Sequence, residues 1–470
     1  MSTFSGLNTA YSGLVAARAG LDVVGQNIAN ANTDGYTRQR LSTNSTSALA
    51  QTGVLANNAF SPGAGVTVTG IVRLASAQLD AHVRAAANSA GYTAVRANAL
   101  SVVEGSFREP GDDGISAQLQ DFWDAWADLS NSADQASPAA LLLVGAGALT
   151  NQIAAGYRAV EAEWNSVRGE LDTMAAELNS SAEQIDVLNA KILAVLTGGG
   201  NANELLDERT QLTTTMSALT GATVRDQGNG TVSVFIGGNA IVSEFGAKTV
   251  TVTGTMKLAG LGVAGGAVGL AWGSGSSTPV GLDGGEMAGA LSLLTAANTD
   301  GTGGMLAEAA ASYNNFAADL ATQVNAAYSP DDADPFFEFT AESAALSLRV
   351  IPTSTSDVRA GTGAGGAFDG SVADAVAQIG TQSDSPDSNW LTFVNGFVVN
   401  TRSELQAASL ASLAQDSAVG RQLANSTVDL DEENVSLLMY QHAYQGAARM
   451  LTAIDEMLDT LINRTGLVGR

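Results

Sequence analysis

The sequence LNTAYSGLVAARAGLDVVGQNIANANTDGYTRQR, residues 7–40, contains the pattern that decides the architecture of the chain. Apolar residues recur in it every seven positions, in two series. The first series is Leu7, Leu14, Leu21 and Ile28, and the second, three positions later, is Ala10, Ala17 and Val24. Two such series form the apolar seam of a coiled coil, here over roughly four heptads. This segment is therefore predicted to be an interface helix.

A polar turn marks the end of this helix. The segment NIANANTDGY, residues 27–36, holds three Asn before Thr33, Asp34 and Gly35. Asn side chains compete with the helix for backbone hydrogen bonds, and Gly can adopt the left-handed conformation that ends a helix. We expect the chain to stop its first helix here.

The C-terminal segment repeats the pattern. One seven-residue series is Leu437, Tyr444, Leu451 and Leu458, and the other is Tyr440, Ala447, Ile454 and Leu461. Before them, DLDEE at 429–433 offers Asp429 or Asp431 as a helix cap, with acids that suit the positive end of the helix dipole. The simplest arrangement packs the first helix on the last.

Charge distinguishes the two ends from the rest of the chain. The whole chain has a net charge of −26 and no Cys, whereas residues 1–40 hold three Arg against two Asp and residues 434–470 hold three Arg against three acids. Nearly neutral ends favour close packing between subunits, since buried charges must be paired or desolvated. An ordinary intramolecular helix pair remains the alternative. The acidic balance argues against a nucleic acid or an anionic membrane as a partner.

The middle of the chain is mostly helical. Apolar residues alternate in steps of four and three over 153–195, which predicts one helix roughly 64 Å long at about 1.5 Å per residue. GGGN at 198–201 breaks this helix, and ELLDERTQLTTTMSAL at 204–219 reads as a returning helix. Residues 75–105 and 114–130 are further predicted members of an antiparallel bundle.

Two β excursions interrupt the helices. Residues 223–243 alternate apolar and polar side chains around GNG and GGN turns, and TVTVTGTMKLAG continues the pattern. Helical periodicity returns over 286–328 and again over 389–424, with a β-like piece at 336–352 and a Gly-rich stretch at 361–370 between them.

These segments predict a mainly α protein with inserted β domains. We expect a terminal coiled-coil assembly domain (1–40 and 425–470), a helical bundle (41–220 with 286–330 and 385–424), an inserted β domain (221–285) and a small β-rich, Gly-rich excursion (331–384).

Export and membrane signals are weak. The first 20 residues lack the basic start and unbroken apolar run of a Sec signal peptide. The uncharged stretch 258–282 holds eight Gly and one Pro beside strand-like sequence, so we predict sheet and loop there rather than a membrane span.

Residues for catalysis are scarce. His82 and His442 are the only His residues, and neither a G-x-S-x-G elbow nor an H-E-x-x-H helix is present. The acidic segments DDG (112–114) and SPDDADP (329–335) are read as solvated loops rather than cation sites. A carboxylate pair stays open among so many acids. We predict no catalytic, cofactor or metal site.

The turn and the ends carry a resemblance to a known family. The axial proteins of the bacterial flagellum, which are the rod, hook and hook-associated proteins, share a run such as N-I-A-N-x-x-T-x-G-Y/F after their first helix. Here the matching residues are Asn27, Ile28, Ala29, Asn30, Thr33, Gly35 and Tyr36. The chain is most similar to the hook-associated proteins at the hook–filament junction. Three further segments carry this similarity: the R-Q that follows the turn, ELLDERTQL, and the ending VDLDEENVSLLMYQHAYQGAARMLTAIDEMLDTLIN.

The resemblance implies a structural function. Terminal helices would pair in an inner tube, ordering only on assembly, and the β domains would face solvent. The implied partners are further copies of the chain, the hook protein, the next hook-associated junction protein, and an export chaperone covering the C-terminal helix. The chain would be secreted through the flagellar type III route, and the turn at Asn30, Thr33, Gly35 and Tyr36 would pass from the inner helix to the next layer.

Two other functions remain open. The chain could be a hook or rod protein, although those typically lack the long helix at 153–195. It could also be a surface enzyme carried on flagellar ends, which paired carboxylates facing a cleft within 221–285 would favour.

Overall fold

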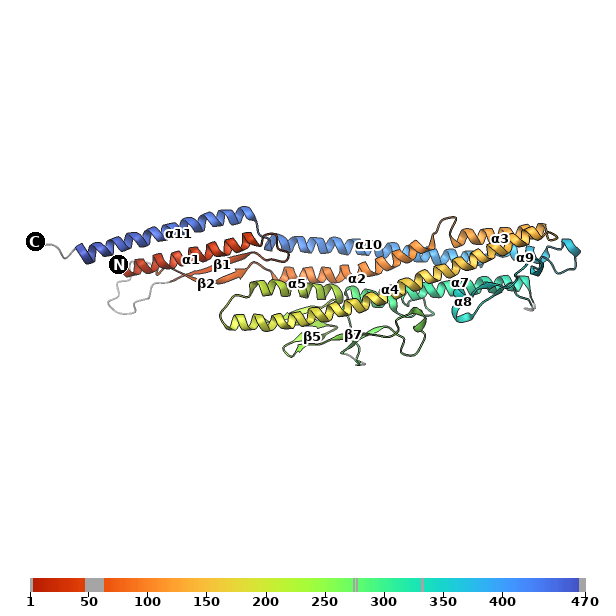
Figure 1. Cartoon of the computed structure of the whole chain (residues 1–470), viewed down its shortest axis with the longest axis horizontal. Helices are drawn as coiled ribbons and strands as arrows, with labels where there is room; N and C mark the ends of the chain where they lie inside the picture. The colour runs from red at the N-terminus through yellow and green to blue at the C-terminus, as the bar shows by residue number, and fades with distance from the viewer. Residues whose placement is uncertain (1–2, 47–62, 274, 276–277, 331–333, 465–470) are drawn as a thin grey trace, which may run out of the picture.

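The computed structural model describes residues 3–46, 63–273, 275, 278–330 and 334–464. The molecule is elongated, and its long helices run along the long axis (Figure 1). The terminal helices α1 (Thr3–Ala29) and α11 (Leu430–Asp459) lie side by side at one end, and the other helices form a body that extends away from them. The expected mainly α architecture with inserted β pieces is confirmed.

The body is organised around α4 (Ala136–Thr197), a helix of 62 residues. The predicted periodic series forms its buried face: Tyr157, Val160, Trp164, Val167, Leu171, Leu178, Ser181, Ile185, Leu188 and Ile192 are buried. The helix begins at Ala136 rather than at 153. Residues 139–149 consist only of Ala, Leu, Val and Gly, so no periodic polar face reveals this first part.

Most other predicted helices are present with small shifts at their ends. They are α2 (Ala77–Phe107), α3 (Ile115–Asn131), α5 (Asn203–Thr220) and α10 (Pro386–Ser426). The helical segment 286–328 is two helices, α6 (Gly285–Leu294) and α7 (Met305–Tyr328). The Gly-rich sequence NTDGTGG at 298–304 separates them, because Gly carries a high backbone entropy cost in a helix.

The inserted β region forms two antiparallel sheets along α4. The first has the order β3 (Thr223–Asp226), β4 (Val232–Ile236), β5 (Asn239–Ser243) and β6 (Gly246–Ala247), and the second pairs β7 (Val250–Thr253) with β8 (Gly269–Trp272). Two Asn of α4 hold these sheets. Asn189 exchanges two hydrogen bonds with the backbone of Val232 (2.8 and 3.1 Å), and Asn179 exchanges two with Val250 (2.8 and 2.7 Å).

The described residues of the stretch 258–282 agree with the prediction of sheet and loop, since they hold a short 3₁₀ turn (Leu258–Gly260) and β8. One helix among the described residues, α4, is long and apolar enough by length and composition to cross a membrane. A core helix of a soluble protein meets the same criterion, and α4 supplies many residues of the core.

The segment after α7 contains little β structure. Its strands are β9 (Phe337–Glu338) and β10 (Arg349–Val350), and it also holds the helices α8 (Ala344–Ser347) and α9 (Ser371–Ala377). Residues 331–333, the start of the predicted excursion and part of the acidic segment 329–335, lie outside the described residues. Phe336 is fully buried, with its ring centroid 5.0 Å from that of Trp126 on α3, so this segment is anchored in the body core.

A β-hairpin that the sequence did not predict links α1 to α2. Strand β1 (Gln39–Ser45) pairs antiparallel with β2 (Val66–Arg73), with Gln39 opposite Arg73 and a register shift between Ser42 and Thr43. The hairpin packs on α1, where the Val66 backbone N–H donates to Ser12 Oγ over 3.2 Å. The terminal unit is therefore larger than two helices.

Candidate assembly interface

Helices α1 and α11 pair antiparallel with a regular register. A Cβ added to Gly6 would contact Ile454, one on Gly13 would contact Ala447, and one on Gly20 would meet Tyr440. The next pair in the same sequence is Asn27 with Glu433, joined by a hydrogen bond of 3.2 Å. Each step is seven residues along both helices, in opposite directions, which is coiled-coil spacing.

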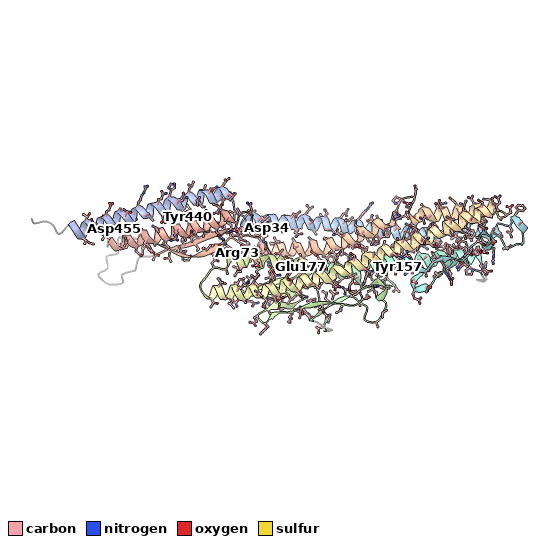
Figure 2. The ribbon with its side chains drawn as sticks, in the orientation of Figure 1. Asp34, Arg73, Tyr157, Glu177, Tyr440 and Asp455 are labelled. Atoms are coloured by element: carbon pink, nitrogen blue, oxygen red, sulfur yellow. The ribbon has the colours of Figure 1, made fainter. Side chains whose placement is uncertain are left out.

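Glycine lets the backbone of α1 approach the side chains of α11 closely. A Cβ on Gly20 would lie 2.4 Å from Tyr440 Cε1, whereas a Cβ on Gly13 would lie 3.9 Å from Ala447 Cβ, an ordinary contact. The ring of Tyr440 therefore occupies the space above Gly20. Figure 2 marks Tyr440 on α11 where that helix lies over α1.

We call Gly6, Gly13 and Gly20, which face α11, the Gly seam. The predicted interface residues lie beside the Gly seam, with some exceptions. Those that are half-buried are Leu7, Leu14, Leu21, Ile28, Leu437, Tyr440, Leu451 and Leu458. Ile454 is buried, and Tyr444 and Leu461 are exposed. Of the two C-terminal series, the one with Tyr440, Ala447 and Ile454 is brought against α1.

Gly6, Gly13, Gly20 and Asn27, which face α11, each lie one position before a residue of the predicted Leu7 series. Sequence reasoning missed Gly6, Gly13 and Gly20 because it selected large apolar side chains. The available signal was their own seven-residue spacing, which ends at Asn27.

Asn27 is the centre of the turn that follows α1. Its Oδ1 accepts hydrogen bonds from the Tyr36 hydroxyl and the Gln39 backbone N–H, both 2.9 Å. Its Nδ2 donates to the Gln39 carbonyl over 2.9 Å and to Glu433. The side chain is 1% exposed and uses both polar atoms, so it fixes the turn, the start of β1 and α11 together.

The other predicted turn residues shape the segment after the helix. Asn30 Nδ2 donates to the Gln26 carbonyl over 3.0 Å, and Thr33 Oγ1 donates to Asn30 Oδ1 over 3.3 Å. Gly35 is left-handed, with φ 75°, as expected, but α1 ends earlier, at Ala29. A Cβ on Gly35 would lie 1.9 Å from Gln211 Nε2 of α5, so Gly35 permits contact with the body rather than ending the helix.

Arg38 joins this turn to the start of α11. Its Nε lies 2.7 Å from Glu433 Oε1 and its Nη1 lies 2.5 Å from Glu432 Oε2, while its backbone N–H donates to the Ser426 carbonyl over 2.8 Å. Burial alone would lower the pKa of Arg38, but the two carboxylates outweigh burial and raise it. Arg38 therefore fixes the elbow, the bend between the end of α10 and the start of α11.

A second ion pair attaches the turn to the body. Asp207 of α5 accepts the Thr37 backbone N–H over 3.0 Å and lies 3.0 Å from Arg73 Nε of β2. Burial raises the pKa of Asp207, although Thr37 and Arg73 lower it. Burial, with Glu204 and Asp207 adding to it, raises the pKa of Tyr36 to about 12. Figure 2 places Asp34 and Arg73 where the terminal helices meet the body.

A cavity of about 1040 Å³ lies at this junction. The turn 30–37, the N-terminal part of α2, α5 and the elbow after α10 line it. Within the residues that the structure describes, no group of three or more His, Asp or Glu is placed to hold a metal ion. His82 and His442 are both exposed.

The outer surface of the α1–α11 pair carries large exposed apolar side chains. Six large apolar side chains of α11 are 47–68% exposed: Leu430, Val435, Leu438, Met439, Met450 and Met457. Tyr11 and Val15 of α1 are 59% and 42% exposed. Exposed apolar surface of this extent is typical of a binding surface for another protein.

The sequence matches three families, all of the flagellum. "Flagellar hook-associated protein FlgK helical domain" matches residues 100–331, "Flagellar basal body rod FlgEFG protein C-terminal" matches 421–464, and "Flagella basal body rod protein" matches 7–37. The two rod families therefore cover the paired ends, and the hook-associated family covers much of the body.

Individual relatives agree with these families. The chain is 30% identical over 523 residues to Flagellar hook-associated protein 1 of Bacillus subtilis, covering 100% of both chains. It is 30% identical over 231 residues to the protein of the same name in Salmonella typhimurium, covering 48% of this chain and 40% of that one. A solved structure, the flagellar hook junction protein FlgK from Burkholderia pseudomallei, is 23% identical, with a TM-score of 0.45 over 54% of this chain and 44% of that chain.

Proposed function

Because the chain belongs to the flagellar hook-associated protein 1 family, as its full-length identity to the Bacillus subtilis relative establishes, we propose that it forms the junction between hook and filament. It is an axial component of the bacterial flagellum, and copies of it join through the paired terminal helices. The relatives are named for a place in the flagellum rather than for a reaction.

The observation that carries this proposal is the α1–α11 pair. The pair is fixed internally by the Gly seam and by Asn27 and Arg38, yet its outer surface exposes large apolar side chains of α11 such as Leu438 and Met439. Burial of such side chains between neighbouring copies would stabilise a continuous assembly, at about 25 cal/mol for each Å² of apolar surface removed from water.

The same surface suggests how the chain is handled before assembly. The partners that we propose are further copies of the chain, the hook protein on one side and the next hook-associated protein on the other. An export chaperone would cover the exposed face of α11 until the chain leaves the cell by the flagellar route. The mature protein would then be extracellular.

We propose the same division into domains that the sequence predicted, with the β1–β2 hairpin added to the terminal domain. Residues 1–40 and 425–470 would form the assembly unit, together with the hairpin of β1 and β2 that packs on α1. The helical body would form the next layer outward, with the β region at 221–285 on its surface. Residues 1–2 and 465–470 lie outside the described residues.

The first experiment is deletion of the gene, with flagellin scored as cell-attached or free in the medium. Completed hooks with flagellin lost to the medium would support a junction function. Absent hooks would instead place the protein in the rod or hook, and normal attached filaments would refute the proposal.

Substitutions then test the paired helices. Leu14→Asp and Leu451→Asp introduce charge beside the Gly seam, and Leu438→Asp introduces it on the exposed face, at a side chain that is 56% exposed. Each is expected to leave the body folded and to release flagellin into the medium. Phe245→Asp, at a residue 91% exposed on the β region, is the matched control and should keep filaments attached.

A further inference from the structure

Helix α10 exposes a single acid, Asp416, and the row of residues on its outward face contains none, in a chain whose net charge is −26. This face takes one residue every three or four positions and is exposed throughout: Thr392, Asn395, Val399, Arg402, Gln406, Leu410, Leu413, Ser417, Arg421 and Ala424. We call it the α10 face. Both of its charged residues are Arg.

The α10 face also carries large apolar side chains. Val399, Leu410 and Leu413 are 65%, 68% and 62% exposed. The opposite side of the helix packs on α2, with Val394, Phe397, Thr401, Ala411 and Ala418 buried. The exposed Leu and Val residues are therefore additional to those that hold α10 in the fold.

A second surface of the body has complementary properties. Residues 136–157 of α4 contain no charged residue, and Leu141 and Val144 within them are 66% and 72% exposed. Helix α3 packs against α4 and exposes three acids, Asp121, Asp124 and Asp128. We call these exposed residues of the two helices the α3–α4 face.

We propose that the α10 face of one copy binds the α3–α4 face of a second copy. Both faces offer large apolar residues, and the charges are opposite, Arg on one and Asp on the other. Two strongly acidic chains repel each other over most of their surfaces, so a contact that sets Arg against Asp is favoured over other approaches.

The geometry of this contact suits an axial structure. Because the two faces differ, the contact is heterologous and can repeat from copy to copy without closing on itself as a twofold dimer does. The inference rests on the proposed function, since it needs the chain to self-assemble. It assigns a second contact, in the body, that is independent of α1 and α11.

Cross-linking tests the contact directly, because the chain has no Cys of its own. Leu410→Cys and Val144→Cys are introduced together and separately, and isolated hook structures that still carry filaments are oxidised. The double variant is expected to give a ladder of covalent multimers, and each single variant none. A double variant without a ladder, or dimers from Leu410→Cys alone, would overturn the proposal.

Charge exchange gives a second measurement. Arg402→Glu with Arg421→Glu is expected to lower the number of attached filaments at least tenfold, and adding Asp124→Lys with Asp128→Lys should restore most of them. Lys191→Glu, at an exposed Lys elsewhere on α4, is the control and should have no effect. Failure of the restoration would overturn the pairing of these faces. Failure of the proposed function would show itself separately, as normal filaments after deletion of the gene.

Discussion

A disulfide between positions 13 and 447 tests the register of the terminal helices. A Cβ on Gly13 lies 3.9 Å from Ala447 Cβ, within the range of about 3.5–4.5 Å that disulfides adopt. Gly13→Cys with Ala447→Cys is therefore expected to form a disulfide on oxidation. The absence of native Cys means that no other thiol competes.

The effect on stability should be large because the loop between the two positions includes most of the chain. For a loop of roughly 430 residues the chain-entropy relation gives about 6 kcal/mol, and measured disulfides reach about 5 kcal/mol. We expect the oxidised variant to gain about 4–5 kcal/mol in free energy of unfolding over its reduced form. Denaturation in urea, with and without reductant, measures this difference.

The controls separate this register from others. Gly25→Cys with Ala447→Cys places the thiol roughly 18 Å further along α1, at about 1.5 Å per residue, where nothing lies within 4 Å of the added Cβ. Leu14→Cys with Ala447→Cys rotates the thiol about 100° around the helix. Non-reducing gels should show the fast-migrating closed form for the 13–447 pair alone. An equal yield from either control would refute the Gly seam.

Three further predictions concern the same unit. Gly20→Ala should loosen the α1–α11 pair, because overlap of the added methyl with the Tyr440 ring costs about 1–3 kcal/mol and replacing Gly in a helix gains only about 0.5–1 kcal/mol. Gly13→Ala meets no such overlap and should keep only the gain. Amide hydrogen exchange of α1 measures the difference, and equal exchange in the two variants would contradict this prediction. Arg38→Gln removes the cation beside Glu433, which is 2% exposed, and should lower the free energy of unfolding by about 3 kcal/mol in urea denaturation. A variant as stable as the parent would show that the Arg38–Glu433 ion pair does not hold α11 in place. Tyr36, whose pKa rises from 10.0 to about 12 on folding, contributes stability that is complete below pH 10 and is lost as pH rises toward 12; unfolding measured across that range should lose this pH dependence in Tyr36→Phe.

The sequence predicted those helices in which apolar residues recur at helical spacing, because this spacing shows which face of the helix is buried. The series over 153–195 predicted the buried face of α4, and the two terminal series predicted that α1 and α11 would pair. Of the two α1 series, Ala10, Ala17 and Val24 are buried, whereas the Leu series lies one residue after the Gly residues that face α11, because a heptad reading ranks Leu14 above Gly13. The actual contact depends on the size of the facing side chain, which is a property of α11.

The elements that were missed depend on partners outside their own local sequence. Strand β1 reads QRLSTNS, which is too polar to predict a strand, and it exists because β2 and α1 cover it. The cluster at the turn likewise draws Asp207 and Glu433 from segments separated from it by 170 and 406 residues. No local pattern reports such contacts.

The two Asn clamps of α4 have a consequence for the surface of the molecule. Asn179 and Asn189 recognise only the N–H and C=O groups of positions 250 and 232, so they specify where each strand lies and not which side chains it carries. Any residue except Pro satisfies such a clamp. The side chains of the outer strands can therefore diverge, or the strands can be exchanged for foreign sequences, while α4 and the positions of the two strands on it stay the same.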